Sequence, residues 1–400
     1  MFSSPRSKSL SILVAFAALA SVAVGSGTRV GFKDAFATGR GNAFVATADN
    51  PSALYYNPAG ITQLAGQQIS STLYFVQIQS DYRSPTGRTA SLDKSFTLVP
   101  QIYYTFTPAE SSWSFGLGVY APFGLESEWP DSAFRTVTTK AKEEFITIAP
   151  TIAYRMSAAL SVAGSITYNR LNVDLRRGIG FVPGDQFRYD GKDSAIAFNL
   201  GLLWKPSPEH SFGLSYQHRT TFNTKGVADT APFIPGGESA SARFEFPEVL
   251  IIGYSFRPTP DWNIEFNLDW TNWGRRNTLV VNKPSGAIAV PFDLKSGFLY
   301  EFGLTRYFAG GMHASLGYVF TEDSSPDHTY NPAIPDSDRH FFSVGVGYKS
   351  AQWQVDAAYQ HAFAVERTAR GTPASLIGET ADGRYRNPID GVAISLGYRF

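Results

Sequence analysis

The chain has 400 residues with 34 basic and 34 acidic side chains, so its formal net charge is zero and nothing favours nucleic-acid binding. Charged residues make up 17%, below the roughly 25% usual for soluble domains, whereas glycine, tyrosine and phenylalanine are plentiful. The sequence contains no cysteine, which excludes disulfide bonds and thiolate metal sites.

The N-terminus has the layout of a secretory signal peptide. Arg6 and Lys8 precede the apolar run Leu10–Val24, and small residues follow it. A buried helix or a membrane anchor is the alternative, but the run is short for a span of about 20 residues. We therefore predict that residues 1–25 are a signal peptide and that the mature protein lies outside the cytoplasm.

Residues 26–65 differ from the rest of the chain in being rich in small residues and in Asn-Pro pairs. The pairs Asn50–Pro51 and Asn57–Pro58 make the segment stiff, because proline fixes its own backbone and restricts the residue before it. Five aromatic residues accompany them: Phe32, Phe36, Phe44, Tyr55 and Tyr56. The segment is too small to form its own core, so we predict that it plugs a barrel formed by residues 66–400.

From residue 67 onward the hydrophobic pattern has a period of two. In Trp262–Trp270 the even positions are all apolar and the odd positions are all polar. Successive strand side chains point to opposite faces, so such a strand has one apolar and one polar face. A soluble sandwich could show the same alternation. The aromatic residues at the ends of the apolar stripes instead favour a membrane-spanning strand with interfacial girdles.

Short and long links between these segments alternate along the chain. Residues 257–261 form a short link, for example, and residues 223–239 and 322–338 form long ones. Bacterial barrels have short periplasmic turns, longer extracellular loops and no open sheet edge. We predict an all-β fold: an antiparallel transmembrane β-barrel of about 14 strands, plugged by a small N-terminal hatch.

The third strand, residues 113–125, is expected to be weak or bulged. Gly116 and Gly118 weaken strand pairing, and Pro122 has no N–H to donate to a ladder. The loop after it, residues 122–138, is rich in large apolar side chains: Phe123, Leu125, Trp129 and Phe134. Exposed aromatic residues in a loop usually mark an interaction site, with packing between loops as the alternative.

No pattern for catalysis or metal binding stands out. The six histidines have no i, i+4 pair, and no G-x-S-x-G elbow occurs. Glu265 and Asp269 lie on one face of a strand, as expected of a lumen wall. Four aspartates could bind a surface cation, but their spacing is not that of an EF-hand: Asp323, Asp327, Asp336 and Asp338. We predict no catalytic residue, no metal and no cofactor.

Several short motifs resemble one known family. In the N-terminal segment they are Gly39–Phe44, Asp49–Ser52 and Asn57–Gly60, and in the barrel they are Ala121–Leu125, Pro150–Arg155 and Pro335–His340. Together and in this order, they are similar to motifs of the outer-membrane long-chain fatty acid transporters (FadL-type), whose relatives admit aromatic hydrocarbons. The resemblance covers essentially the whole mature chain.

This resemblance implies a passive channel for hydrophobic small molecules in the bacterial outer membrane. Extracellular loops would capture the ligand and pass it to a lumenal pocket, with lateral release near the third strand. We expect ligand-binding or gating roles for 13 residues: Phe44, Tyr55, Tyr56, Asn57, Pro58, Ala59, Gly116, Gly118, Pro122, Phe123, Gly124, Trp129 and Phe134. The expected partners are the ligand, outer-membrane lipids and the barrel insertion machinery, which would read the terminal Phe400; a monomer is expected.

Four alternatives stay open at this point. The cargo could be an aromatic hydrocarbon and not a fatty acid. A general porin would usually have about sixteen or more strands, and an energised, plugged transporter about 22. An outer-membrane esterase is a further option, because a catalytic triad is recognised by geometry and not by sequence order. A fatty acid would favour a cationic partner for its carboxylate, which spacing alone does not identify.

Overall fold

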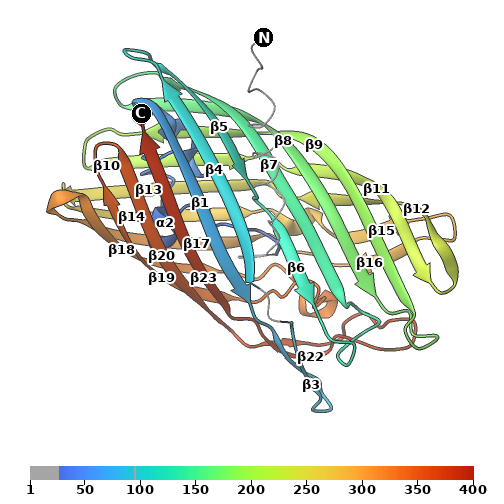
Figure 1. Ribbon diagram of the computed structural model, residues 1–400. Coiled ribbons are helices and arrows are strands. Elements are labelled where there is room, and N and C mark those ends of the chain that lie inside the picture. Colours follow the sequence, from blue (N-terminus) through green and yellow to red (C-terminus); the bar gives the residue numbers. More distant parts are fainter. Residues whose placement is uncertain (1–26, 94–95) are drawn as a thin grey trace, which may run out of the picture.

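The computed structural model describes residues 27–93 and 96–400, so the predicted signal peptide lies outside the described residues. The main sheet closes into an antiparallel barrel of 14 strands, as predicted (Figure 1). Several of these barrel strands are interrupted, so the sheet contains 19 strand segments. No helix among the described residues is long and apolar enough to cross a membrane.

Most barrel strands run without a break: β1 Gly66–Ile78, β4 Phe96–Thr107, β7 Lys140–Arg155, β8 Leu160–Arg177, β9 Gln186–Trp204, β18 Met312–Thr321, β19 Arg339–Lys349, β20 Trp353–Ala364 and β23 Ile389–Arg399. The others are each made of two segments: β5 Trp113–Tyr120 with β6 Gly124–Glu128, β10 His210–Gln217 with β11 Thr220–Ala231, β12 Ile234–Phe246 with β13 Val249–Thr259, β14 Trp262–Thr271 with β15 Thr278–Asn282, and β16 Ile288–Pro291 with β17 Gly297–Tyr307.

The ring closes because the first and last barrel strands pair. Leu73 of β1 lies opposite Ile394 of β23 on one side and opposite Pro100 of β4 on the other. At the long-loop end, four short strands form a separate sheet: β2 Asp81–Arg83, β3 Thr89–Ser91, β21 Arg367–Ala369 and β22 Gly383–Arg386. Single-turn helices occupy three links: η3 Trp273–Arg275, η4 Ala309–Gly311 and η5 Asp327–Thr329.

The two faces of the strands have the predicted polarity. In β14, Phe266 is 46% exposed, whereas its neighbours Glu265 and Asn267 are fully buried. Apolar side chains therefore cover the outside, where a bilayer would solvate them, and polar side chains point inward.

The long-loop end contains more strand than the sequence indicates. Residues 223–239 were expected to form a loop, yet β11 continues to Ala231 and β12 starts at Ile234, so a tight turn joins them. The prediction failed because this hairpin extends beyond the lipid band, where neither face needs to be apolar. Pairing with the extended β9, such as Lys225 opposite Lys192, supplies the backbone hydrogen bonds instead.

Residues 27–65 lie within the ring of strands and are almost entirely buried (Figure 1). They form three short helices: α2 Ala35–Gly39, α3 Ala53–Tyr56 and η2 Pro58–Gln63. Asp34 caps α2 by accepting a 3.0 Å hydrogen bond from the N–H of Ala37. We call residues 27–65 the plug; its status as a separate domain stays a prediction.

Glycines in the barrel wall let the plug backbone come close. A Cβ on Gly345 of β19 would lie 2.8 Å from the Cα of Gly39, and one on Gly317 of β18 would lie 2.0 Å from the backbone nitrogen of Gly41. Real Cβ atoms do not occupy such positions, so any side chain at these strand positions would push the plug away. This explains why glycines recur in strands that otherwise have strong hydrophobic alternation.

Candidate functional site

The third barrel strand is broken where the sequence predicts weakness. β5 ends at Tyr120, β6 starts at Gly124, and the three residues between them contact the plug. Val30 donates a 2.9 Å backbone hydrogen bond to Pro122, and Gly124 donates one of 2.9 Å to Thr28. We call residues 121–123 the kink; its backbone groups are partnered by the plug and not by a neighbouring strand.

The break leaves a lateral discontinuity in the barrel wall. β5 pairs with β4 only through residues Phe115–Val119, and β6 pairs with β7. Residues 96–101 of β4 pair with β1, and among the described residues no ladder joins them to β6. The wall between β4 and β6 therefore lacks the continuous hydrogen bonding that closes the rest of this region.

An aromatic column lies inside the barrel next to the kink. Phe123 is 5.4 Å from Phe145 and 5.1 Å from Phe246, measured between ring centroids. Phe222 joins the same cluster at 5.2 Å from Phe145, and Trp273 lies 5.8 Å from Phe123. These five side chains are buried and come from different parts of the ring, so they form an apolar cluster next to the discontinuity.

A groove of about 60 Å³ lies at the long-loop end of this column. Its apolar lining includes Phe187, Leu279 and Phe292. The buried Arg276 connects groove and column, because its guanidinium lies 5.5 Å from the ring of Phe292 and 5.7 Å from the ring of Phe246. Its partner is the equally buried Glu143 of β7. One guanidinium nitrogen of Arg276 (Nη1) has no hydrogen-bond partner.

The predicted aromatic residues of the plug form a second cluster, which contacts the end of β5 just before the kink. Phe44 contacts Tyr56 at 5.4 Å, Tyr55 contacts Tyr56 at 5.1 Å, and Tyr55 contacts Tyr120 of β5 at 5.2 Å. All four rings are buried. Burial raises the pKa of Tyr56 well above its ordinary value, with smaller effects from its hydrogen bond to the N–H of Lys33 and from nearby charges.

Asn57 ties the plug to the barrel through backbone groups. Its side-chain Nδ2 donates to the carbonyl of Val45 at 2.8 Å and to that of Leu202 of β9 at 2.9 Å. Its Oδ1 accepts from the N–H of Ala59, with Pro58 between them starting η2. Asn57 therefore links the plug to the lumen wall through a strand carbonyl.

The remaining predicted residues fall into two groups: glycines in or next to the third strand, and aromatic residues under the outer loops. Gly116 faces the plug, since a Cβ there would lie 2.4 Å from a methyl carbon of Leu54. Gly118 and Gly124 flank the kink. Trp129 and Phe134 were expected to be exposed, but they are buried under the outer loops, 4.9 Å apart. The alternative explanation, packing between loops, applies to them because Trp129 also donates a 2.9 Å hydrogen bond to the carbonyl of Pro332.

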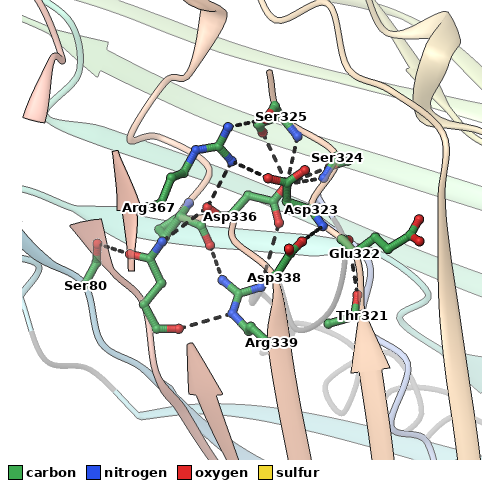
Figure 2. Close-up of polar contacts among 12 residues, drawn as sticks. Ser80, Thr321, Glu322, Asp323, Ser324, Ser325, Asp336, Asp338, Arg339 and Arg367 are labelled. Carbon is green, nitrogen blue, oxygen red and sulfur yellow. Dashed lines mark hydrogen bonds and ion pairs between the residues drawn. The ribbon is translucent and has the colours of Figure 1, made fainter. Parts of the chain in front are cut away.

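The loop aspartates form a network with arginines and do not surround an open cation site (Figure 2). Asp336 accepts hydrogen bonds from the N–H groups of Ser324 at 2.7 Å and Ser325 at 3.1 Å. Arg367 contacts Asp327 at 2.8 Å and Asp323 at 3.2 Å. This network joins the outer loops on one side of the barrel mouth. No metal-binding group of three or more acidic or histidine side chains occurs in residues 27–93 and 96–400.

Sequence reasoning missed the buried charges that hold the plug. Arg29 pairs with Asp269 of β14 at 2.6 Å, and Arg40 contacts Glu265 of the same strand at 3.4 Å. The sequence did offer one signal. On β14 both carboxylates lie on the inward face, next to outward-facing aromatic residues, so they were available to pair with a cation in the lumen. Nothing in the spacing of the plug arginines indicates which carboxylate each would meet.

A second polar cluster lies at the short-turn end, in a cavity of about 310 Å³ between plug and barrel. Its lining includes Asp34 of the plug and Asp356 of β20, which forms a 2.7 Å contact with His313. Burial, helped by the charge of Asp356, raises the pKa of Asp34 to about 6.

Comparison with known proteins places this architecture in a family. The family model described as outer membrane protein transport protein (OMPP1/FadL/TodX) matches residues 16–400. A long-chain fatty acid transport protein of Escherichia coli is 21% identical, covering 85% of this chain and 87% of the relative.

Solved structures share the fold. A Pseudomonas aeruginosa FadL homologue covers 94% of this chain and 100% of its own, with 18% identity and a TM-score of 0.83. The Pseudomonas putida toluene transporter TodX covers 94% and 100%, with 15% identity and a TM-score of 0.72. The chain therefore belongs to the OMPP1/FadL/TodX family of transport proteins for hydrophobic molecules in the bacterial outer membrane.

Proposed function

We propose that this protein is a passive channel for long-chain fatty acids or related lipids, which leave it sideways into the outer membrane through the discontinuity between β4 and β6. The observation that carries this proposal is the kink: residues 121–123 leave the wall and bind the plug, while residues 96–101 of β4 have no ladder to β6. An apolar cargo gains nothing from entering the aqueous periplasm, so an exit into lipid suits it best.

The proposed path starts in the groove at the long-loop end and follows the aromatic column to the kink. Each step is lined by buried apolar side chains, among them Phe292, Phe246 and Phe123. Arg276 stands between groove and column with one unpartnered nitrogen, which suits a cargo that carries an acidic head group. The closed packing of the path means that cargo entry requires side chains to move.

A disulfide between plug and kink tests the route directly, because the chain contains no other cysteine. Arg29 and Phe123 form an antiparallel bridge, so Val30 and Pro122 are the next opposed pair. Cα atoms of such pairs are about 4.5–5.5 Å apart, which is within the range for a disulfide. The double variant Val30→Cys with Pro122→Cys should therefore lock the kink under oxidising conditions.

Uptake of labelled oleate by cells with the oxidised variant should fall to background and recover after reduction. The double serine variant at the same positions controls for the substitutions themselves. Crosslink formation is checked by mass spectrometry of the peptide pair. A fully crosslinked protein that still takes up oleate at the wild-type rate would rule out the kink as the exit.

Uptake of monoaromatic hydrocarbons is the second candidate function. The column of phenylalanine rings around Phe123 and Phe145 would suit flat aromatic molecules, since ring pairs at 4.5–7 Å are favourable. Competition between labelled oleate and excess toluene in the same cells separates the two candidates. Strong inhibition by toluene together with direct toluene uptake would favour the hydrocarbon.

A general porin or an esterase finds less support. The plug lies inside the barrel, and the cavity between plug and barrel at the short-turn end measures only about 310 Å³. The family consists of transport channels, and among the described residues His313 hydrogen-bonds to Asp356 and to no serine.

A further inference from the structure

Lys33 of the plug has an unusual environment at the kink. Its side chain is fully buried, and its Nζ donates a hydrogen bond to the carbonyl oxygen of Ala121, the first kink residue. The ammonium also lies 5.3 Å from the centre of the Tyr55 ring. A single side chain thus joins the plug to the point where the third barrel strand leaves the wall.

Lys33 has no anionic partner among the described residues. Within residues 27–93 and 96–400, none of the ion pairs includes Lys33, and the charge that acts on its pKa is that of another cation, Arg29. The adjacent carboxylate of Asp34 is turned to the N–H of Ala37 and to the side chain of Asn50. Burial and the charge of Arg29 lower the pKa of Lys33 well below its ordinary value. A buried ammonium without an anionic partner is costly and tends to lose its proton, whereas an incoming carboxylate stabilises the charged form at this position.

Lys33 also lies next to the lateral discontinuity. The backbone at this point is held from the β4 side, where Gln101 donates to the carbonyl of Phe32 at 3.4 Å and Tyr103 donates to that of Lys33 at 3.5 Å. Its side chain reaches the kink on the opposite side. The backbone at Lys33 therefore contacts β4 while its side chain contacts the kink, so this residue links the two edges between which an exiting molecule would pass.

We propose that Lys33 binds the carboxylate of the fatty-acid cargo at this opening and that this contact releases the kink from the plug. The inference rests on the proposed function and adds the head group that the exit recognises. An ammonium and a carboxylate attract each other as opposite charges in addition to forming a hydrogen bond, whereas a neutral carbonyl offers only the hydrogen bond, so the cargo can displace Ala121. The carbonyl of Ala121 then has no partner in the plug, which favours movement of the kink.

Arg276 is a weaker candidate for this role, because Glu143 already neutralises it. Lys33 is the cation at the kink without such a partner, and this difference makes a specific test possible. Oleate and oleyl alcohol share the same hydrocarbon chain and differ only in the head group. The proposal requires Lys33 for the first ligand and not for the second.

The experiment compares Lys33→Met and Lys33→Arg with the wild type in a Gram-negative host that lacks its own transporter of this class. Lys192→Met, at an exposed lysine of β9, serves as the matched control. Uptake of labelled oleate and oleyl alcohol is measured for each variant, together with heat-modifiable folded barrel in the outer membrane. Binding of both ligands to purified protein in mild detergent provides a readout that does not depend on insertion.

We expect Lys33→Met to lower oleate uptake and affinity by about tenfold, the loss of one charged hydrogen bond, and not to lower uptake or affinity for oleyl alcohol. Lys33→Arg should retain most oleate uptake. Wild-type oleate uptake by Lys33→Met would overturn the proposal, and so would an equal loss for both ligands, which indicates a structural role. Transport of neither ligand by the wild type would instead refute the proposed function, and the Lys33 proposal with it.

Discussion

Removing Arg29 should release the plug without unfolding the barrel. Arg29 is 3% exposed and Asp269 is fully buried; their 2.6 Å ion pair joins the start of the plug to β14. Arg29 also donates to the hydroxyl of Thr271 at 2.9 Å. In Arg29→Met the carboxylate of Asp269 would stay buried with only a 3.4 Å contact from Thr271.

The expected loss of free energy follows from the removal of Arg29, the charged partner of Asp269. Breaking a buried ion pair by removing one member typically costs about 3–5 kcal/mol, which shifts an equilibrium by roughly two to three and a half orders of magnitude. The cost falls on plug docking, because Arg29 belongs to no barrel strand and the ladders of β14 with β13 and β17 are untouched. The double variant Arg29→Met with Asp269→Asn removes both charges and should regain much of the loss.

Single-channel conductance in planar bilayers measures plug release, and the heat-modifiable band on gels measures the barrel. Arg29→Met should open an ion-conducting pore far more often than the wild type, with the folded band preserved. The double variant should conduct less often than the single variant. Wild-type conductance in Arg29→Met, or a double variant that opens more often than the single one, would show that this ion pair does not hold the plug.

Four further changes probe the wall, the plug and the loops. Leu268→Arg on the lipid face should cost about 2–4 kcal/mol if it lies near the midplane, measured by urea unfolding in lipid vesicles. The inward Asn267→Arg should instead displace the plug, because Asn267 is fully buried and donates to the carbonyl of Asn42 at 3.1 Å; conductance without loss of the folded band would be the result. Deleting residues 57–59 should preserve insertion but reduce oleate uptake to background, and normal uptake would exclude the plug as the gate. Partial desolvation raises the pKa of Asp185, but hydrogen bonds from loop N–H groups and from Arg135 outweigh this effect and lower that pKa. The loop at 178–185 should thus be protected from hydrogen exchange above the ordinary aspartate pKa of about 3.9 and lose protection as the pH falls below it. In Asp185→Asn, the protection factor of this loop, relative to the unfolded chain, should be low at every pH.

The sequence by itself determined the architecture. Alternation of apolar and polar residues assigns the two faces of each strand, as in β14, where Phe266 faces outward and Glu265 inward. This works because lipid imposes the same local requirement on every residue pair of a spanning strand. The weakness of the third strand could also be predicted from the sequence, because Pro122 and the nearby glycines act through their own backbone properties.

The contacts between plug, loops and wall were decided only by the tertiary structure. Burial of Trp129 and Phe134 under other loops, the arginine partners of the loop aspartates and the pairing of β11 with β9 all involve residues far apart in sequence. The same holds for Arg29 with Asp269 and for Lys33 with Ala121. Closure of the barrel determines which inward side chain lies opposite each plug residue. The residues next to a plug cation in the sequence therefore do not indicate its partner.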